Sequence, residues 1–370
     1  MKFTCEKALL SSAIATVSRT VAPKSAIVAL EGILVRAGMK LNLSGYNLET
    51  GVTATVDADI TSTGECVMPA RLFFDIVRKL PDDIVTVRVD EAYRVTITCG
   101  ISKFTFTAMS AEDYPELPDV EFENAIHIPQ AELKKLISGT LFSVSENMAR
   151  PIHTGCKFEV ENESITCVAV DGYRMALRRY FPEEGTGRTA SFVVPASGLK
   201  EVERILSDLD GDASFTLGTK HILFEMDGAA VVCRLLEGEF LDWRRVLPTG
   251  NPIRLTGKVS EITGSIERVG LVISEKVKSP VRCVFTTDRV DMTTTSTIGT
   301  AHDECTLAGD GQELEIGFNC KYLLEAFKAV PDAETTLELS NNLSPIVLTP
   351  CDGTGRYAYM VLPVRMRSGE

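Results

Sequence analysis

Residue types that could carry out catalysis or bind a metal are few in this sequence, and their spacing is unfavourable. The four histidines lack a second ligand at a spacing typical of metal sites: His127, His153, His221 and His302. The ten cysteines include no C-x-x-C pair, so we expect buried structural thiols and no zinc or iron–sulfur site. Glycine-rich phosphate loops and the G-x-S-x-G nucleophile motif are also missing. We therefore predict that the protein is not an enzyme and has no cofactor or metal.

Two segments instead have the chemistry of a binding surface. Val170–Met175 contains an Asp-Gly turn followed by Tyr173 and Arg174, an aromatic ring beside a cation. An ordinary hairpin corner is the alternative. The segment Tyr359–Met366 holds flexible methionines, and its Pro363 lacks a backbone donor, which suits a sheet edge or a groove wall. The alternative is a final core strand, which we expect the upstream half of this segment to form in either case.

The charge distribution indicates a further candidate binding surface, separate from these two segments. The chain carries a net charge of −13, which by itself argues against a nucleic-acid partner. However, the six helices that the sequence predicts hold 13 Lys and Arg against 7 Asp and Glu. If this basic layer faces one way, it can bind phosphate backbones without sequence preference. The alternative is that helix surfaces are simply rich in charged residues.

A threefold internal repeat organises these segments. Residues 67–82, 193–208 and 317–332 share one pattern, a strand end followed by a helix. Aligned on their final aspartates, the copies lie 126 and 124 residues apart. In the first copy, the apolar residues of Leu72–Leu80 recur at helical spacing and predict one buried face.

Each repeat is expected to form an α+β domain with two helices and about eight short antiparallel strands. The helices are expected at residues 7–20, 70–80, 130–144, 196–206, 258–271 and 319–330. Segments such as Val85–Val89 and Lys103–Thr107 alternate apolar and polar residues, which predicts half-buried strands. The three domains are predicted to span residues 1–122, 123–250 and 251–370.

In this order, the motifs resemble the family of bacterial replicative sliding clamps, the β subunits of DNA polymerase III. The family pattern has an Asp-Gly-aromatic-Arg turn in its middle domain, here Asp171–Arg174. It has an aromatic-Arg-Arg-Val-Leu-Pro run at the end of that domain, here Trp243–Pro248, and an apolar tail with Pro and Arg, here Tyr359–Met366. The start at Met1–Phe3 also fits, and the similarity covers essentially the whole chain.

The resemblance implies the DNA clamp fold, three tandem copies of a two-helix, antiparallel-sheet domain, with six domains in the ring of a head-to-tail homodimer. Helices would line the hole and sheets would lie outside, which gives the basic layer a role against duplex DNA. The implied function is that of a processivity factor, which tethers the replicative polymerase and other replication and repair proteins to DNA. The family needs no cofactor.

The resemblance also assigns residues to three surfaces. The DNA-facing residues are Lys24, Arg78, Lys79, Arg150, Lys200 and Arg204. The dimer interface comprises Phe104 and Phe106 on an edge strand and, opposite, Val272 and Ile273; alternatively, all four belong to the cores of their own domains. The groove comprises His153, Gly172, Tyr173, Arg174, Met175, Leu241, Arg245, Val246, Pro345, Met360, Val361, Leu362, Pro363, Val364, Arg365 and Met366. There the clamp loader, the replicative and repair polymerases, mismatch-repair proteins and ligase would bind through short linear peptides.

The chain departs from the family pattern at three places. His153 falls where many relatives have an aliphatic residue, and Tyr173 stands where His is common. Both can reshape the groove. Four residues follow Met366, where the family often stops, and they can partly cover the groove.

Two other functions stay open at the level of sequence. A repeat-built enzyme or ligand carrier would need a pocket between domains with a convergent polar cluster. A monomeric scaffold with three domains in an arc would have a solution mass near 40.3 kDa instead of twice that value. No apolar run is long enough for a signal peptide or a membrane helix, so we expect a soluble cytoplasmic protein.

Overall fold

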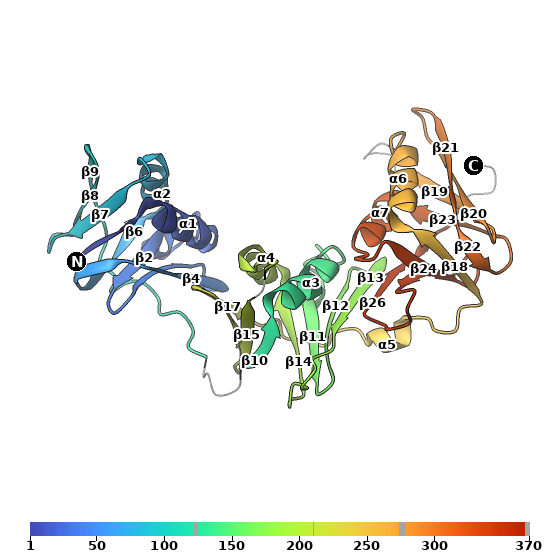
Figure 1. Cartoon of the computed structure of the whole chain (residues 1–370), viewed down its shortest axis with the longest axis horizontal. Coiled ribbons are helices and arrows are strands. Elements are labelled where there is room, and N and C mark those ends of the chain that lie inside the picture. The colour runs from blue at the N-terminus through green and yellow to red at the C-terminus, as the bar shows by residue number, and fades with distance from the viewer. Residues whose placement is uncertain (121–124, 210, 274–278, 367–370) are drawn as a thin grey trace. The chain divides into compact units, whose positions relative to one another are not determined.

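The computed structural model describes residues 1–120, 125–209, 211–273 and 279–366, and its elements follow the three repeats (Figure 1). The first repeat contains β1 (Lys2–Glu6), α1 (Lys7–Val17), β2 (Gly32–Ala37), β3 (Leu41–Tyr46), β4 (Thr50–Val56), β5 (Asp59–Ser62), β6 (Gly64–Pro69), α2 (Ala70–Lys79), β7 (Ile84–Val89), β8 (Arg94–Cys99) and β9 (Ser102–Thr107). The second contains β10 (Ile126–Pro129), α3 (Gln130–Leu141), β11 (Gly155–Glu161), β12 (Ser164–Val170), β13 (Arg174–Tyr180), β14 (Ala190–Pro195), α4 (Ala196–Ile205), β15 (Asp212–Leu217), β16 (His221–Met226), β17 (Ala229–Arg234) and the short α5 (Trp243–Val246). The third contains β18 (Ile253–Lys258), α6 (Val259–Gly270), β19 (Pro280–Phe285), β20 (Arg289–Thr295), β21 (Thr300–Thr306), β22 (Ala308–Asp310), β23 (Leu314–Asn319), α7 (Cys320–Lys328), β24 (Glu334–Leu339), β25 (Ile346–Thr349), β26 (Tyr357–Val361) and β27 (Pro363–Val364).

The six helices predicted from the sequence are confirmed, and each begins directly after a strand. Pro69, Pro129 and Pro195 end the strands before α2, α3 and α4, where the fixed φ of proline suits the entry into a helix. In α2, Phe73 and Val77 lie on the buried face, four residues apart, as the apolar spacing predicts, whereas Leu72, predicted on the same face, is 43% exposed. None of the described helices is long and apolar enough to cross a membrane.

Helix α1 is shorter than the sequence predicts. It ends at Val17 and passes into a 3₁₀ turn at Ser18–Thr20. The hydroxyl of Ser18 donates to the carbonyl of Ile14 (2.6 Å), and that of Thr20 donates to the carbonyl of Val17 (3.1 Å). Both hydroxyls bond to carbonyls of the last helical turn, where an α-helix often tightens into a 3₁₀ turn.

The chain divides into two compact units, each of which we describe by itself. The first unit comprises Met1–Lys134 and Ser197–Leu235. It contains a five-stranded sheet, β5-β1-β7-β8-β9, and an eight-stranded sheet, β10-β15-β16-β17-β4-β3-β2-β6, both antiparallel. In the second sheet, Val231 of β17 lies opposite Val52 of β4. This pairing joins strands of the first and second repeats in one hydrogen-bonded sheet.

The second unit comprises Lys135–Ala196 and Leu236–Glu370. Its nine-stranded sheet has the order β14-β11-β12-β13-β26-β25-β24-β18-β22, and its five-stranded sheet has the order β21-β20-β19-β23-β27. Leu177 of β13 lies opposite Ala358 of β26, so this unit also joins two repeats through one sheet. The predicted boundary between residues 122 and 123 lies outside the described residues, and the one at 250/251 lies between α5 and β18.

The core of the third repeat holds β26 in place. Helices α6 and α7 lie side by side (Figure 1) and bury Ile266 and Phe327 against the strands. The ring of the fully buried Tyr359 stacks on that of Tyr357, with centroids 5.2 Å apart. The hydroxyl of Tyr359 donates to the carbonyl of Ala329 (3.1 Å), just beyond α7. Strand β26 also pairs with β13 along one edge and with β25 along the other, and it leads into the C-terminal tail.

Most cysteines pack as small apolar residues. Eight of the ten are buried, as expected for structural thiols, whereas Cys320 is half-buried and Cys351 is exposed. Burial raises the pKa of Cys5 and of Cys66 to about 12. These two thiols are therefore protonated and unreactive at neutral pH.

Candidate functional site

The turn between β12 and β13 is shaped by its own side chains. One carboxylate oxygen of Asp171 accepts hydrogen bonds from the backbone amides of Tyr173 (2.9 Å) and Arg174 (3.0 Å). Gly172 adopts a φ of +92°, a conformation that strains residues with a side chain. The Asp-Gly pair seen in the sequence therefore makes a tight turn that projects the two following side chains in a fixed direction.

Arg174 connects this turn to the third repeat. Its side chain is only 8% exposed, and it forms ion pairs with Asp171 (2.9 Å) and with Glu325 of α7. The guanidinium carbon lies 4.4 Å from the ring centroid of Tyr322 and 5.4 Å from that of Phe142. Because its charge is already balanced by two carboxylates, Arg174 acts first as a structural link between β13 and α7.

The C-terminal tail alternates between two faces. Met360, which is buried, and Leu362, which is partly exposed, both line a pocket beside the β12–β13 turn, and the amide of Leu362 donates to the carbonyl of Tyr173 (2.9 Å). Val361 is fully buried in the core of the third repeat. Its side chain faces the core and does not line the pocket, because successive residues of a strand face opposite sides, so its assignment to the groove stays a prediction.

The rest of the tail continues as a sheet edge. Pro363 and Val364 form β27, which pairs with Phe318 and Gly317 of β23. Met366 packs over Gly317, where any larger side chain would collide with it. Pro363 is half-buried, Val364 and Arg365 are exposed, and the extension at residues 367–370 lies outside the described part of the chain.

These segments surround a pocket of about 370 Å³ in the second unit. Eight predicted groove residues line it: His153, Gly172, Arg174, Met175, Leu241, Val246, Met360 and Leu362. Sequence reasoning missed Ser145 and Asn147, and it assigned Arg150 to DNA; Val170 and Asp171 also line the pocket and lie in the Val170–Met175 segment that the sequence singled out, although the groove list left them out. Ser145 donates its amide to the carbonyl of His153 (3.0 Å), so the loop before His153 folds back along the pocket. The sequence signal that could have identified Ser145 and Asn147 is their position in the loop before His153, a predicted groove residue.

Three other predicted groove residues lie outside the lining of this pocket. Tyr173 is exposed and stacks on Tyr322, with ring centroids 5.9 Å apart. Arg245 projects from α5 and forms an ion pair with Asp242 (3.0 Å). Pro345 is half-buried in the segment before β25. All three can contact only a ligand that extends beyond the pocket.

His153 gives the pocket an aromatic wall. Its ring meets that of Phe240 edge to face, with centroids 5.2 Å apart. Burial lowers the pKa of His153 below its ordinary value, and the nearby charge of Arg150 lowers it further. His153 is therefore neutral at pH 7, and the pocket accepts apolar groups against an uncharged ring.

The cations predicted to face DNA are exposed, but they differ in their partners. All six side chains are exposed: Lys24, Arg78, Lys79, Arg150, Lys200 and Arg204. Arg78 pairs with Asp75 (3.7 Å) and Arg204 pairs with Glu201 (2.5 Å), each within its own helix. Among the described residues, the other four have no carboxylate partner within ion-pair distance, which leaves their charges available to a ligand.

Many other helix cations are neutralised by acidic neighbours. The pairs are Lys7–Asp82, Lys134–Asp208, Lys258–Glu261, Arg268–Asp303 and Lys328–Glu267. The excess of positive charge that the sequence indicates for the helices is therefore confined to a few free side chains.

The predicted interface residues lie at the margins of their units. In the five-stranded sheet of the first unit, β9 is an edge strand, as expected from its sequence. Phe104 is 40% exposed and Phe106 is half-buried, so Phe104 is not a core residue of its own domain. Val272 and Ile273 are half-buried just after α6, and Ile273 packs against the core of the third repeat.

Comparison with known sequences decides the family. The chain matches three domains of the DNA polymerase III beta subunit in order: the N-terminal domain at residues 1–118, the central domain at 127–242 and the C-terminal domain at 244–365. The chain belongs to this family.

Individual clamps are similar over the whole length. The beta sliding clamps of Staphylococcus epidermidis and Staphylococcus aureus are 28% and 29% identical to the chain, each over 99% of both sequences. The solved sliding clamp of Bacillus subtilis gives a TM-score of 0.94 at 28% identity. That of Pseudomonas aeruginosa, bound to griselimycin, gives 0.93 at 27% identity. Both structural comparisons cover 99% of this chain and 100% of the other.

The predictions of a clamp fold and a clamp function are therefore confirmed. The chain is a DNA sliding clamp, a processivity factor that works with DNA polymerase on DNA, and it is not an enzyme. The enzyme or ligand-carrier alternative is thereby removed.

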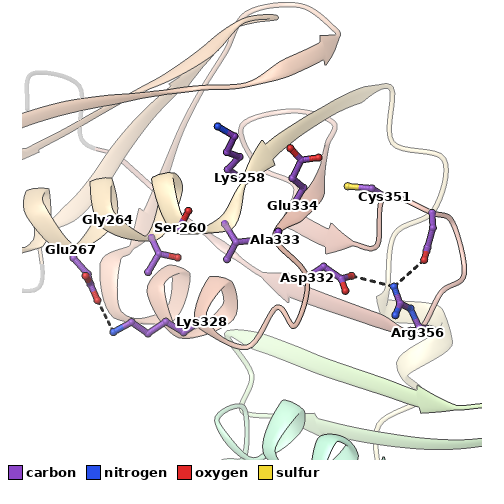
Figure 2. Close-up of a pocket in the computed structure, with 13 residues that line it drawn as sticks. Lys258, Ser260, Gly264, Glu267, Lys328, Asp332, Ala333, Glu334, Cys351 and Arg356 are labelled. Carbon is purple, nitrogen blue, oxygen red and sulfur yellow. Dashed lines mark hydrogen bonds and ion pairs between the residues drawn. The ribbon is translucent and has the colours of Figure 1, made fainter.

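The clamp has a larger hollow in its third repeat, of about 920 Å³. Figure 2 shows Arg356 paired with Asp332 and Lys328 paired with Glu267. Arg356 also pairs with Asp352, and Lys258 pairs with Glu261. Because these charges are internally balanced, the hollow offers no clear preference for an anion or a cation.

Proposed function

We propose that two copies of the chain close head to tail into a ring of six domains around duplex DNA in the cytoplasm, with domains at residues 1–122, 123–250 and 251–370. The open edge of β9 with its exposed Phe104 supports one side of the interface. The apolar Val272 and Ile273 at the end of α6 support the other side. An unpaired strand with an exposed aromatic residue is a surface that a partner chain typically covers.

The DNA-facing surface uses four cations without a carboxylate partner among the described residues, Lys24, Lys79, Arg150 and Lys200, together with Arg78 and Arg204. A few exposed cations hold phosphates weakly and without sequence preference. A ring needs no more than that, because its closure prevents escape while weak contacts permit sliding.

The pocket beside the β12–β13 turn binds short linear peptides with an apolar end. Through it the clamp loader, the replicative and repair polymerases, mismatch-repair proteins and ligase bind the ring. The observation that carries this proposal is the pocket itself, where Leu241, Val246 and Leu362 leave apolar surface exposed beside the neutral ring of His153. Short peptides bind such slots through a few buried apolar anchors.

The test is fluorescence polarization of a labelled Gln-Leu-Asp-Leu-Phe peptide titrated with the protein. We expect saturable binding that Leu241→Asp weakens by about tenfold or more, because a carboxylate would enter the apolar wall. Leu343→Asp is the matched control, since Leu343 is 72% exposed and does not line the pocket. Absence of binding by the folded protein, or equal weakening by both variants, would exclude this pocket as the peptide site.

A further inference from the structure

One wall of the pocket depends on a very short helix. Leu241 precedes α5 and Val246 ends it, and both side chains line the pocket while remaining partly exposed. Helix α5 has only four residues, and a helix of one turn is not stable on its own. Contacts with the rest of the unit must therefore set the position of this wall.

Trp243 is the main anchor of α5. It is the only tryptophan in the chain, and its side chain is buried among residues of the second and third repeats, including Leu177, Phe240 and Ala358. Because Leu241 lies two residues before Trp243 and Val246 lies three residues after it, the position of the indole ring determines where both lining side chains sit.

The indole of Trp243 is held by a buried carboxylate on β11. One oxygen of Glu159 accepts a hydrogen bond from the indole nitrogen of Trp243 (3.2 Å) and one from the guanidinium of Arg244 (2.7 Å). Its other oxygen pairs with the ammonium of Lys157 (2.7 Å). The guanidinium of Arg244 also lies over the indole, 4.3 Å from the ring centroid, and Arg179 lies 5.5 Å from it.

Glu159 is ionised in this setting although it is buried. Burial alone would raise the pKa of its carboxyl, but hydrogen bonds from Lys157 and Arg244 outweigh that effect and hold the pKa below its ordinary value. A buried carboxylate with three donors fixes the groups that surround it, because moving any of them would leave a desolvated charge unsatisfied.

We propose that Glu159 is a positioning residue for the peptide pocket: through Trp243 and Arg244 it holds α5 where Leu241 and Val246 form the pocket wall. This inference rests on the proposed role of the pocket. Glu159 itself does not line the pocket, so it acts on a bound peptide only through α5.

The test compares Glu159→Gln with Glu161→Gln. Glu161 is a matched control, because it lies two residues along the same strand and contacts Arg244 (3.4 Å) but has no bond to Trp243. Acrylamide quenching of the single tryptophan reports on α5, and polarization of the Gln-Leu-Asp-Leu-Phe probe, which lacks tryptophan, reports on the pocket. We expect Glu159→Gln to raise the quenching constant about twofold and to weaken probe binding about tenfold, the loss typical of one charged hydrogen bond. Glu161→Gln should change neither.

The proposal is overturned if Glu159→Gln leaves quenching unchanged, or if quenching rises while probe affinity stays at the wild-type value. Should Glu159→Gln fail to fold, Arg244→Gln makes the same comparison, since Arg244 is half-exposed and its loss removes one of the same bonds. If the wild-type protein does not bind the probe, the proposed peptide function fails, and quenching alone still decides whether Glu159 holds Trp243.

Discussion

At the scale of single residues, the surroundings of a side chain decide its role more than its type does. Arg174 and Arg245 are both arginines that the family resemblance assigns to the groove. Arg174 is 8% exposed and bonded to two carboxylates, whereas Arg245 is 86% exposed and pairs only with Asp242. The first is part of the framework, and the second is available to a ligand.

The two arginines should therefore differ in their effect on stability. Arg174→Ala would leave two carboxylates without their partner in a partly desolvated site, and we expect a loss of about 3 kcal/mol in the free energy of unfolding. Arg245→Ala should cost no more than about 0.5 kcal/mol, because exposed ion pairs contribute little. Urea unfolding measures both values. Similar small losses would show that Arg174 is not a structural link.

His153 should titrate below its ordinary pKa of 6.5. Because the folded state resists its protonation, the stability that neutral His153 provides is complete above pH 6.5 and is lost as pH falls below that value. Arg150→Gln should raise the pKa only partly, since burial is the larger cause. NMR titration of the imidazole protons measures this shift, with His221 as the internal control. An unchanged pKa in the variant would show that the charge of Arg150 does not act on His153.

At the scale of elements, the sequence predicts local structure well and long-range pairing poorly. The spacing of apolar residues gives the six helices within about three residues of their ends. The sequence also shows the alternation that places the side chains of Val361 and Met360 on opposite faces of their strand. The family resemblance alone assigned both residues to the groove. The pairings of β4 with β17 and of β13 with β26 join strands far apart in the sequence. No local pattern encodes which strand edges meet, so these joints could not be derived from the repeat.

Close packing of helix α1 on β3 gives a prediction at this scale. A Cβ atom on Gly45 would lie 2.1 Å from the carbonyl oxygen of Val17, so Gly45→Ala must displace the end of α1. We expect a loss of about 2 kcal/mol or more, as for overpacked cores. Gly38→Ala is the matched control in the same repeat, because nothing lies within 4 Å of its Cβ position. Thermal unfolding of both variants measures the difference in stability. Equal melting temperatures would contradict the close packing of Gly45 against Val17.

At the scale of the whole molecule, the proposed DNA-facing surface of this acidic protein rests on a small number of free cations. The chain carries a net charge of −13, and several helix cations are paired with acids. The electrostatic field of the remaining unpaired cations is weak, so binding to DNA that the protein does not encircle should be slight. Stable association then has to come from topology, which requires the ring to be closed. In the proposed ring, the dimer interface is therefore the feature on which stable association with DNA most depends.

Phe104→Asp should open the ring, because it puts a charge on the exposed edge of β9 without entering the core of its own domain. Sedimentation should show the mass falling from twice 40.3 kDa to that value, and retention on closed circular DNA should be lost. Ile101→Asp is the matched control, since Ile101 is fully exposed at the turn before β9 and is not among the predicted interface residues. A Phe104→Asp protein that stays dimeric would place the interface elsewhere. A monomeric wild type would instead favour a scaffold of three domains over a ring.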